Sequence, residues 1–147
     1  MRSHICRDPA DMKQDRTTVV LDADGFSKLA RGDRRVREMI HQEVVAGTAD
    51  VAVPWVAVMQ ALVEGAGQRA VERVIDAIGM PTGLDRARAQ LGAQLLRDSR
   101  TTDLPDALVA VEALRCAPSI VITSDPDDIR RLLDEDPQGV RVAVWGV

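Results

Sequence analysis

Short apolar runs rich in β-branched residues alternate with longer segments of helical periodicity, and this alternation limits the possible folds more than any other feature. The runs at residues 18–21, 51–53, 119–122 and 140–144 are typical of buried strands. Helical patterns lie between them. Strands that alternate with helices predict an α/β fold, in which a mainly parallel central sheet lies between two layers of helices as a three-layer α/β/α sandwich.

The helical segments are bounded by residues that commonly start or stop helices. Pro54, Pro105 and Pro126 suit the first turn of a helix, and Gly65 follows the end of one. At Met80 the pattern suggests the start of a further short strand. The predicted helices span about residues 25–32, 36–45, 54–63, 69–78, 84–95, 105–116 and 126–133.

The length of 147 residues is that of a single domain with a substantial core. Because hydrophobic order begins at Thr17, we interpret residues 1–16 as a flexible N-terminal tail and residues 17–147 as the domain. No apolar run approaches the roughly 18 residues of a membrane span, and the first residues lack the apolar core of a secretion signal. We therefore expect a cytoplasmic protein that does not enter the membrane.

The composition narrows the possible chemistry. The two cysteines and two histidines have no metal-binding spacing, so a zinc site or a histidine-based triad is hard to build. Tyrosine is absent and phenylalanine occurs once, which nearly excludes stacking of bases on aromatic platforms. A net charge of −4 does not indicate a protein that coats nucleic acid electrostatically. The chemistry falls mainly to carboxylates.

Aspartates occur in three segments that the predicted fold brings to one place. They directly follow the first strand, directly follow the 119–122 strand, and open the helix that leads into that strand. Sites in parallel α/β sheets lie beyond the carboxyl ends of the strands, so we expect these acids at one edge. Gathered like charges need a cation, and hard oxygen donors suit Mg²⁺ or Mn²⁺. The acids are Asp22, Asp24, Asp103, Asp106, Asp125, Asp127 and Asp128.

Helix capping is the competing interpretation, because each of these acids lies near an expected helix start and Asp is a preferred cap. Residues Ser124 to Asp128 form a good capping sequence, and Asp103 is placed to cap the helix that contains Asp106. For any single acid the two interpretations are about equal. Capping explains Asp22 and Asp106 less well, since Asp is a poor helix former. Taken together, the acids favour a metal site.

Four motifs resemble the PIN domain, and in particular the VapC-type toxins. They are Val-Leu-Asp-Ala-Asp at 20–24, Val-Pro opening a helix at 53–54, Thr-Asp-Leu-Pro-Asp-Ala at 102–107, and Val-Ile-Thr-Ser-Asp-Pro-Asp-Asp at 121–128. The resemblance covers about residues 17–147, and its last two motifs are fairly specific together, although each is weak alone. It implies a metal-dependent endoribonuclease, often a toxin held by a small antitoxin.

The resemblance implies roles for individual residues. Asp22 matches the family's first metal-binding aspartate, Asp106 the third acid and Asp125 the fourth. Thr123 matches the hydroxyl residue that precedes the fourth acid and would lie near the substrate. With Mg²⁺ or Mn²⁺ bound, such a site would activate water for in-line attack on the scissile phosphate. The family resemblance implies products with 5′-phosphate and 3′-hydroxyl ends.

Asp103 and Asp128 match accessory acids of the family, whereas two other positions depart from its pattern. The second acid, a glutamate in the helix after the second strand, is replaced by Gln60. Its carbonyl oxygen can still bind a metal but brings no charge. Glu64 lies one helical turn further on and could substitute, although a solvated surface acid is the simpler interpretation. Asp24 stands where members usually carry a small polar residue.

The resemblance also implies partners. RNA would be the substrate, an antitoxin segment would lie across the groove, and relatives generally form homodimers. Arginines after the first motif, with Arg31 and Arg34 among them, could contact RNA phosphates through two parallel hydrogen bonds, although such charges are usually a solvated face. Trp55 and Met59, with Val58 on the same helix, are expected in the core or on a homodimer surface.

Two other functions stay open. With Gln60 in place of an acid, the domain could be a catalytically weakened PIN module that binds RNA or a partner protein without cleavage. The run at 19–25 also resembles the opening of haloacid-dehalogenase-type phosphatases, with Asp22 as nucleophile and Asp24 as general acid. That chemistry, like that of a receiver domain, needs a downstream lysine, and Lys13 and Lys28 both lie too early. We therefore favour the nuclease.

Overall fold

The computed structural model describes residues 16–45 and 49–147, and the centre of this part is a parallel sheet. Its strands are β1 (Thr17–Leu21), β2 (Ala49–Ala52), β3 (Ser119–Thr123) and β4 (Val142–Gly146). They lie in the order β2-β1-β3-β4, and each neighbouring pair runs parallel. The predicted parallel α/β sheet is confirmed.

Helices connect these strands as predicted. Pro105 and Pro126 lie in the first turn of their helices, whereas Pro54 precedes its helix as the N-cap residue. Each predicted helix is present, with ends shifted by a few residues at most. The helices are α1 (Ala23–Ala30), α2 (Arg34–Val45), α3 (Trp55–Val63), α4 (Gln68–Ile78), α5 (Arg86–Ser99), α6 (Leu104–Arg115) and α7 (Pro126–Leu133).

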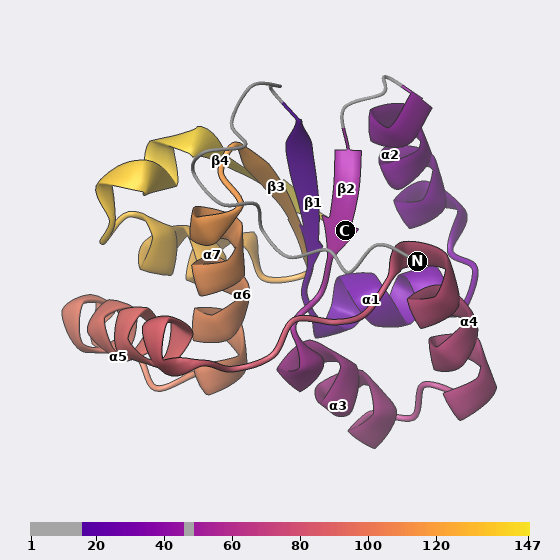
Figure 1. Cartoon of the computed structure of the whole chain (residues 1–147), viewed down its shortest axis with the longest axis horizontal. Coiled ribbons are helices and arrows are strands. Elements are labelled where there is room, and N and C mark those ends of the chain that lie inside the picture. The colour runs from indigo at the N-terminus through magenta and orange to yellow at the C-terminus, as the bar shows by residue number, and fades with distance from the viewer. Residues whose placement is uncertain (1–15, 46–48) are drawn as a thin grey trace.

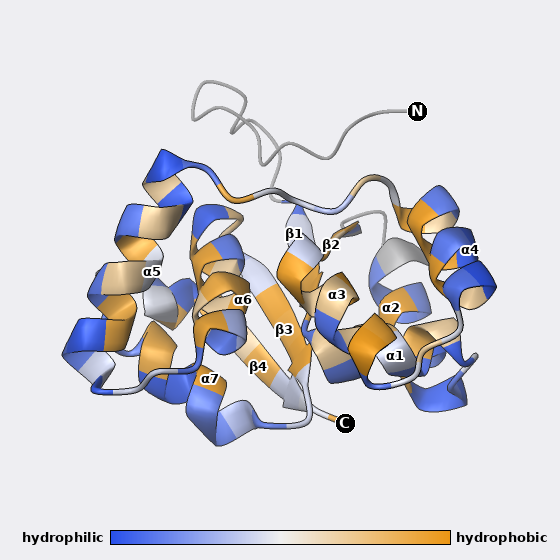
Figure 2. Cartoon of the chain, turned by 90° about the horizontal axis from the view of Figure 1, so that it is seen from below, coloured by the Kyte–Doolittle hydropathy of each residue, from blue (hydrophilic) through white to orange (hydrophobic). Residues whose placement is uncertain are grey.

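Helices cover both faces of the sheet (Figure 1). Successive side chains of a strand point to opposite faces. Val19 and Leu21 of β1 therefore pack with α1, α3 and α4, whereas Val20 packs with α5, α6 and α7. In Figure 2 the hydrophobic residues concentrate on the strands and inner helix faces, and hydrophilic residues mark the outer turns of α5 and α7. The protein is a three-layer α/β/α sandwich.

Two strand predictions differ from the structure. The last strand begins at Val142 rather than at residue 140, because Pro137–Arg141 form a 3₁₀ helix. The strand expected at Met80 is reduced to a single isolated bridge between Pro54 and Thr82. Proline has no N–H for a ladder, so a longer pairing through residues 80–82 is disfavoured at Pro81.

The predicted flexible tail at residues 1–16 lies outside the described residues apart from Arg16, so it stays a prediction. None of the helices in the described part is both long enough and apolar enough to cross a membrane.

The strand order produces a switch point between β1 and β3 at the carboxyl edge of the sheet, and we refer to this edge as the crevice. From β1 the chain crosses to β2 on one side, and from β3 it crosses to β4 on the other, so the connections leave the two central strands in opposite directions. Ligands of such sheets bind beyond the strand ends at this point. Helix α6 packs against both central strands and leads back into β3, so its N-terminus lies at the same edge.

Candidate active site

Asp22 lies at the end of β1 and is the N-cap residue of α1. Its Oδ1 atom accepts a hydrogen bond of 2.7 Å from the backbone N–H of Gly25, and its exposed fraction is only 6%. Capping therefore explains Asp22 better than the sequence suggested. Capping uses one of the roughly four lone-pair positions of the carboxylate, so the same side chain can still take part in a site.

Gly25 allows the start of α1 to lie directly against the end of β3. A Cβ atom at this position would lie 2.7 Å from the carbonyl oxygen of Ile122. The backbone N–H of Asp22 donates to that same oxygen at 3.3 Å. A side chain larger than hydrogen would push the β1–α1 turn away from β3, so Gly25 sets how closely the acids of the two turns approach.

The residues that follow β3 hold both Asp22 and Asp125. The Thr123 side chain is completely buried, and its hydroxyl accepts a 2.9 Å hydrogen bond from the N–H of Asp125. Burial raises the pKa of the Asp22 carboxyl, and hydrogen bonds from Gly25, Thr123 and Ser124 oppose this by stabilising the ionised form. Since Thr123 is buried, we assign it to positioning these acids rather than to contacting a substrate.

The turn before α7 does not use its polar residues as the capping interpretation predicted. Asp125 occupies the N-cap position, but its side chain makes no capping hydrogen bond and is exposed. The hydroxyl of Ser124 donates instead to the Oδ2 atom of Asp24, across the gap between the two turns. Ser124, which looked like part of the cap of α7, is therefore bonded to the first turn of α1 instead.

Asp103 and Asp106 lie at the start of α6. Asp103 is the N-cap residue, as predicted, and accepts a 3.0 Å hydrogen bond from the N–H of Asp106. The carboxylate of Asp106 is half-buried, and within residues 16–45 and 49–147 it has no hydrogen-bond or ion-pair partner. A half-buried carboxylate without a donor is costly when it is ionised.

The electrostatics of Asp106 show that the acids are neighbours. Burial raises its pKa to about 7, with further contributions from the negative charges of Asp103, Asp22, Asp125 and Asp128. These charges come from the end of β1, the turn before α7 and the start of α6. The three segments therefore bring carboxylates near enough for their charges to act on Asp106.

A divalent cation fits this donor set in its chemistry, although the donors are not preassembled. Carboxylate oxygens are the ligands that Mg²⁺ and Mn²⁺ prefer, and the repulsion at Asp106 is what a cation would relieve. In the part of the chain that the structure describes, no three acidic, histidine or cysteine side chains are arranged to hold one ion. Like charges separate when nothing neutralises them, so binding would require side chains to turn inward.

Gln60, Arg31 and Arg34 are not joined to the acids by any hydrogen bond or ion pair in the described part. Gln60 lies on α3, and its amide donates to Glu64 at 3.0 Å on the same helix. Arg31 follows the end of α1 opposite Asp22, roughly 12 Å away for eight residues of helix. Arg34 is exposed and forms a 2.8 Å ion pair with Glu38. The two arginines can reach only the flanks of the crevice.

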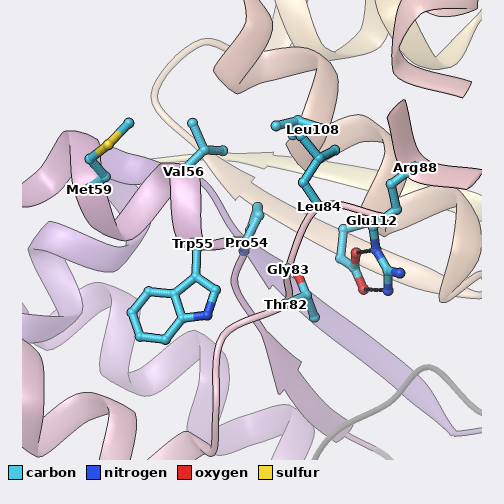
Figure 3. Close-up of a pocket in the computed structure, with 10 residues that line it drawn as sticks. All are labelled: Pro54, Trp55, Val56, Met59, Thr82, Gly83, Leu84, Arg88, Leu108 and Glu112. Carbon is cyan, nitrogen blue, oxygen red and sulfur yellow. Dashed lines mark hydrogen bonds and ion pairs between the residues drawn. The ribbon is translucent and has the colours of Figure 1, made fainter. Parts of the chain in front are cut away.

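An apolar cavity lies between α3, α5 and α6 (Figure 3). Its volume is about 380 Å³, and its lining includes Trp55, Met59, Leu84 and Leu108. At its edge the guanidinium of Arg88 donates to the buried carboxylate of Glu112 at 2.9 Å. None of the acids at the crevice lines this cavity. The cavity is therefore a separate feature, although α3 and α6 also carry residues predicted for the site.

No protein-family model matches the sequence, and no curated protein matches it. The fold is similar to a chain in the crystal structure of VapBC2 from Rickettsia felis, in which VapBC2 is bound to a DNA fragment from its own promoter. The TM-score is 0.61, the sequence identity is 10%, and the similarity covers 89% of this chain and 99% of the other. At this identity the similarity shows the fold alone, and the PIN-like three-layer sandwich is confirmed.

Gly25→Ala tests how tightly the two turns must pack. We expect it to lower the free energy of unfolding by about 1–3 kcal/mol, because the new methyl group cannot fit beside the carbonyl oxygen of Ile122. The measurement is urea denaturation followed by circular dichroism. Gly83→Ala is the matched control, since a Cβ there meets nothing within 4 Å, and it should change stability by less than about 0.5 kcal/mol. Equal stability of both variants would contradict the close packing.

Proposed function

We propose that this chain is a metal-dependent endoribonuclease of the VapC type, which cleaves RNA phosphodiester bonds with Mg²⁺ or Mn²⁺. The carrying observation is the half-buried carboxylate of Asp106, repelled by acids from three segments. Perturbed carboxylates gathered in a crevice are a common sign of a functional site, and a divalent cation directly relieves their repulsion. The fold shared with a VapBC2 chain supports this choice of function.

Asp22, Asp106 and Asp125 are the proposed cation ligands, with Asp103 and Asp128 in support. Asp22 is fixed by its hydrogen bonds, whereas the carboxylates of Asp106 and Asp125 have no bonds in the described part that would stop them from turning. When bound, the cation would ionise water near neutral pH and stabilise negative charge on the phosphate. The acids hold it beside β1 and β3, and no protein nucleophile is required.

The partner proposed for this chain is a small antitoxin protein. The similar fold belongs to a chain of VapBC2, a complex named for two components. We place the antitoxin segment across the crevice, which leaves the exposed apolar side chains of α3 for contact with a second copy of the chain.

A binding module without cleavage is the second candidate function. The observation that favours it is the Gln60 amide, which brings no charge and is hydrogen-bonded to Glu64 along α3. A cation held by fewer carboxylates binds less tightly. The two candidate functions therefore differ in whether the carboxylates of Asp22, Asp106 and Asp125 alone hold a cation tightly enough for cleavage.

Asp22→Asn and Asp106→Asn are each expected to lower the rate of RNA cleavage at least about a hundredfold, because each removes a charge that would hold the cation. The protein is loaded with Mn²⁺ and incubated with total RNA, and the cut ends are mapped by sequencing. Asp76→Asn is the matched control, since it changes an exposed acid on α4, and it should cleave as the wild type does.

The same variants separate the two candidate functions. RNA that is bound but left intact in both Mg²⁺ and Mn²⁺ would favour the binding module, and Gln60→Glu would then test whether one added carboxylate restores cleavage. Cleavage that survives Asp106→Asn unchanged would rule out the proposed site. In EDTA, Asp106→Asn should unfold at a higher temperature than the wild type, because it removes a repelled charge and needs no RNA to show it.

Arg31 and Arg34 are proposed to contact RNA phosphates that flank the site. The double variant Arg31→Ala/Arg34→Ala should weaken binding of fluorescent RNA. It should also reduce the slope of log K against log salt concentration by about 1.4, the value for two phosphate contacts to a single strand. The titration uses the Asp106→Asn background at several salt concentrations, so that no RNA is cut. Arg97→Ala, on α5 over the other face of the sheet, is the control. An unchanged slope would mean that both arginines are solvated and do not contact RNA.

We further propose that α3 forms a homodimer surface. Val58 is buried in the core, whereas Trp55, Met59 and Leu62 are 44%, 60% and 41% exposed on the same helix. Met59→Glu should convert a dimer into a monomer in analytical ultracentrifugation, since a buried unpaired charge is costly. Val140→Glu changes a side chain that is 90% exposed in the 3₁₀ helix and should leave the mass unchanged. A wild-type chain that is monomeric at all concentrations would contradict this surface.

A further inference from the structure

Ser124 contacts both acids of the β1–α1 turn. Its hydroxyl donates to the Oδ2 atom of Asp24, and its backbone N–H donates to the carboxylate of Asp22. Asp24 lies in the first turn of α1, and Ser124 directly precedes Asp125. The two hydrogen bonds therefore join the segment that carries Asp22 to the segment that carries Asp125, across 100 residues of sequence.

The hydroxyl of Ser124 adds a side-chain contact to the other contacts between these turns. The backbone contact from Asp22 to Ile122 and the close approach of Gly25 hold the end of β3 against α1. Thr123 is buried below them. Ser124 itself is half-buried, and within the described residues the hydrogen bond to Asp24 is the one that its side chain makes.

We propose that Asp24 is a positioning residue, which acts through Ser124 to fix the separation of Asp22 and Asp125 and thereby the width of the cation site. This inference rests on the proposed function, because only a bound cation gives that separation a consequence. Asp24 is not proposed as a ligand, since its charge acts on Asp22 but is not among those that act on Asp106. Residues that orient metal ligands typically change metal affinity 10- to 100-fold when they are removed, roughly the effect expected here.

The test is a double-mutant cycle on Mn²⁺ binding, measured by isothermal titration calorimetry with the full chain. Asp24→Ala and Ser124→Ala should each weaken Mn²⁺ binding about 10- to 100-fold. The double variant should bind no more weakly than either single variant, because both remove the same bond. Asp24→Asn should stay within a few-fold of the wild type, since an amide can still bond to the hydroxyl.

Thermal unfolding of the same four variants in EDTA gives a readout that needs neither cation nor RNA. Coupling between Asp24 and Ser124 in both measurements supports positioning. Coupling in stability alone would make the bond merely structural and overturn the inference. If Asp24→Asn loses as much Mn²⁺ affinity as Asp24→Ala while Ser124→Ala loses none, Asp24 acts through its charge and the inference is wrong.

Asp106→Asn distinguishes failure of this inference from failure of the proposed function. If it weakens Mn²⁺ binding while the Asp24 and Ser124 variants do not, the cation site stands and only the positioning role falls. If Asp106→Asn and the wild type bind Mn²⁺ alike, or neither binds it, the cation site itself is wrong and the positioning role falls with it.

Discussion

Repulsion between carboxylates is the constraint on which the site depends. Because β1 and β3 are neighbours, the acids that follow them lie at adjacent strand ends, and α6 starts at the same edge. Asp106 is half-buried there and feels the charges of four other acids, so its pKa rises to about 7. Nothing in the hydrophobic core requires an acid at this position, since the inner face of α6 is already filled by buried apolar side chains. The proposed cation would explain this arrangement.

The fold treats the acids differently, and this determines how a cation could be accommodated. Asp22 is buried but stabilised by donors from Gly25, Thr123 and Ser124, whereas Asp125 is exposed to solvent. Asp106 is half-buried, but within the described residues no hydrogen-bond donor stabilises its carboxylate. No group of acids in the described residues is preassembled around one ion. Binding would therefore turn Asp106 and Asp125 toward a fixed Asp22, because the hydrogen bonds of Asp22 oppose any rotation of its own.

The three layers and the parallel sheet could be predicted, because hydrophobic periodicity records burial. That the three acid-bearing segments lie at one edge follows from strands that run parallel. The local use of each acid could not be predicted. Asp22 is a helix cap, which the sequence did not favour, and Asp125, which looked like a cap, makes no capping bond. The reason is the contact of Ser124 with Asp24, between residues 100 apart, which no local pattern encodes. The strand expected at Met80 failed for a local reason, the missing N–H of Pro81.

In the PIN family, which this chain resembles, a glutamate usually stands at the position of Gln60 and a small polar residue at the position of Asp24. This chain therefore has one acid fewer on α3 and one more on α1. The total charge of the region is unchanged by this exchange, but its distribution is not. The Gln60 amide donates a hydrogen bond to Glu64 on α3, and Asp24 accepts one from Ser124. Neither side chain therefore adds a free cation ligand to the crevice. A cation here would take its protein ligands from the β1, β3 and α6 side alone and leave more positions to water and phosphate oxygens. Because RNA phosphates would then complete the coordination, we expect occupancy of the site to be coupled to substrate: cation and RNA would each bind more tightly in the presence of the other.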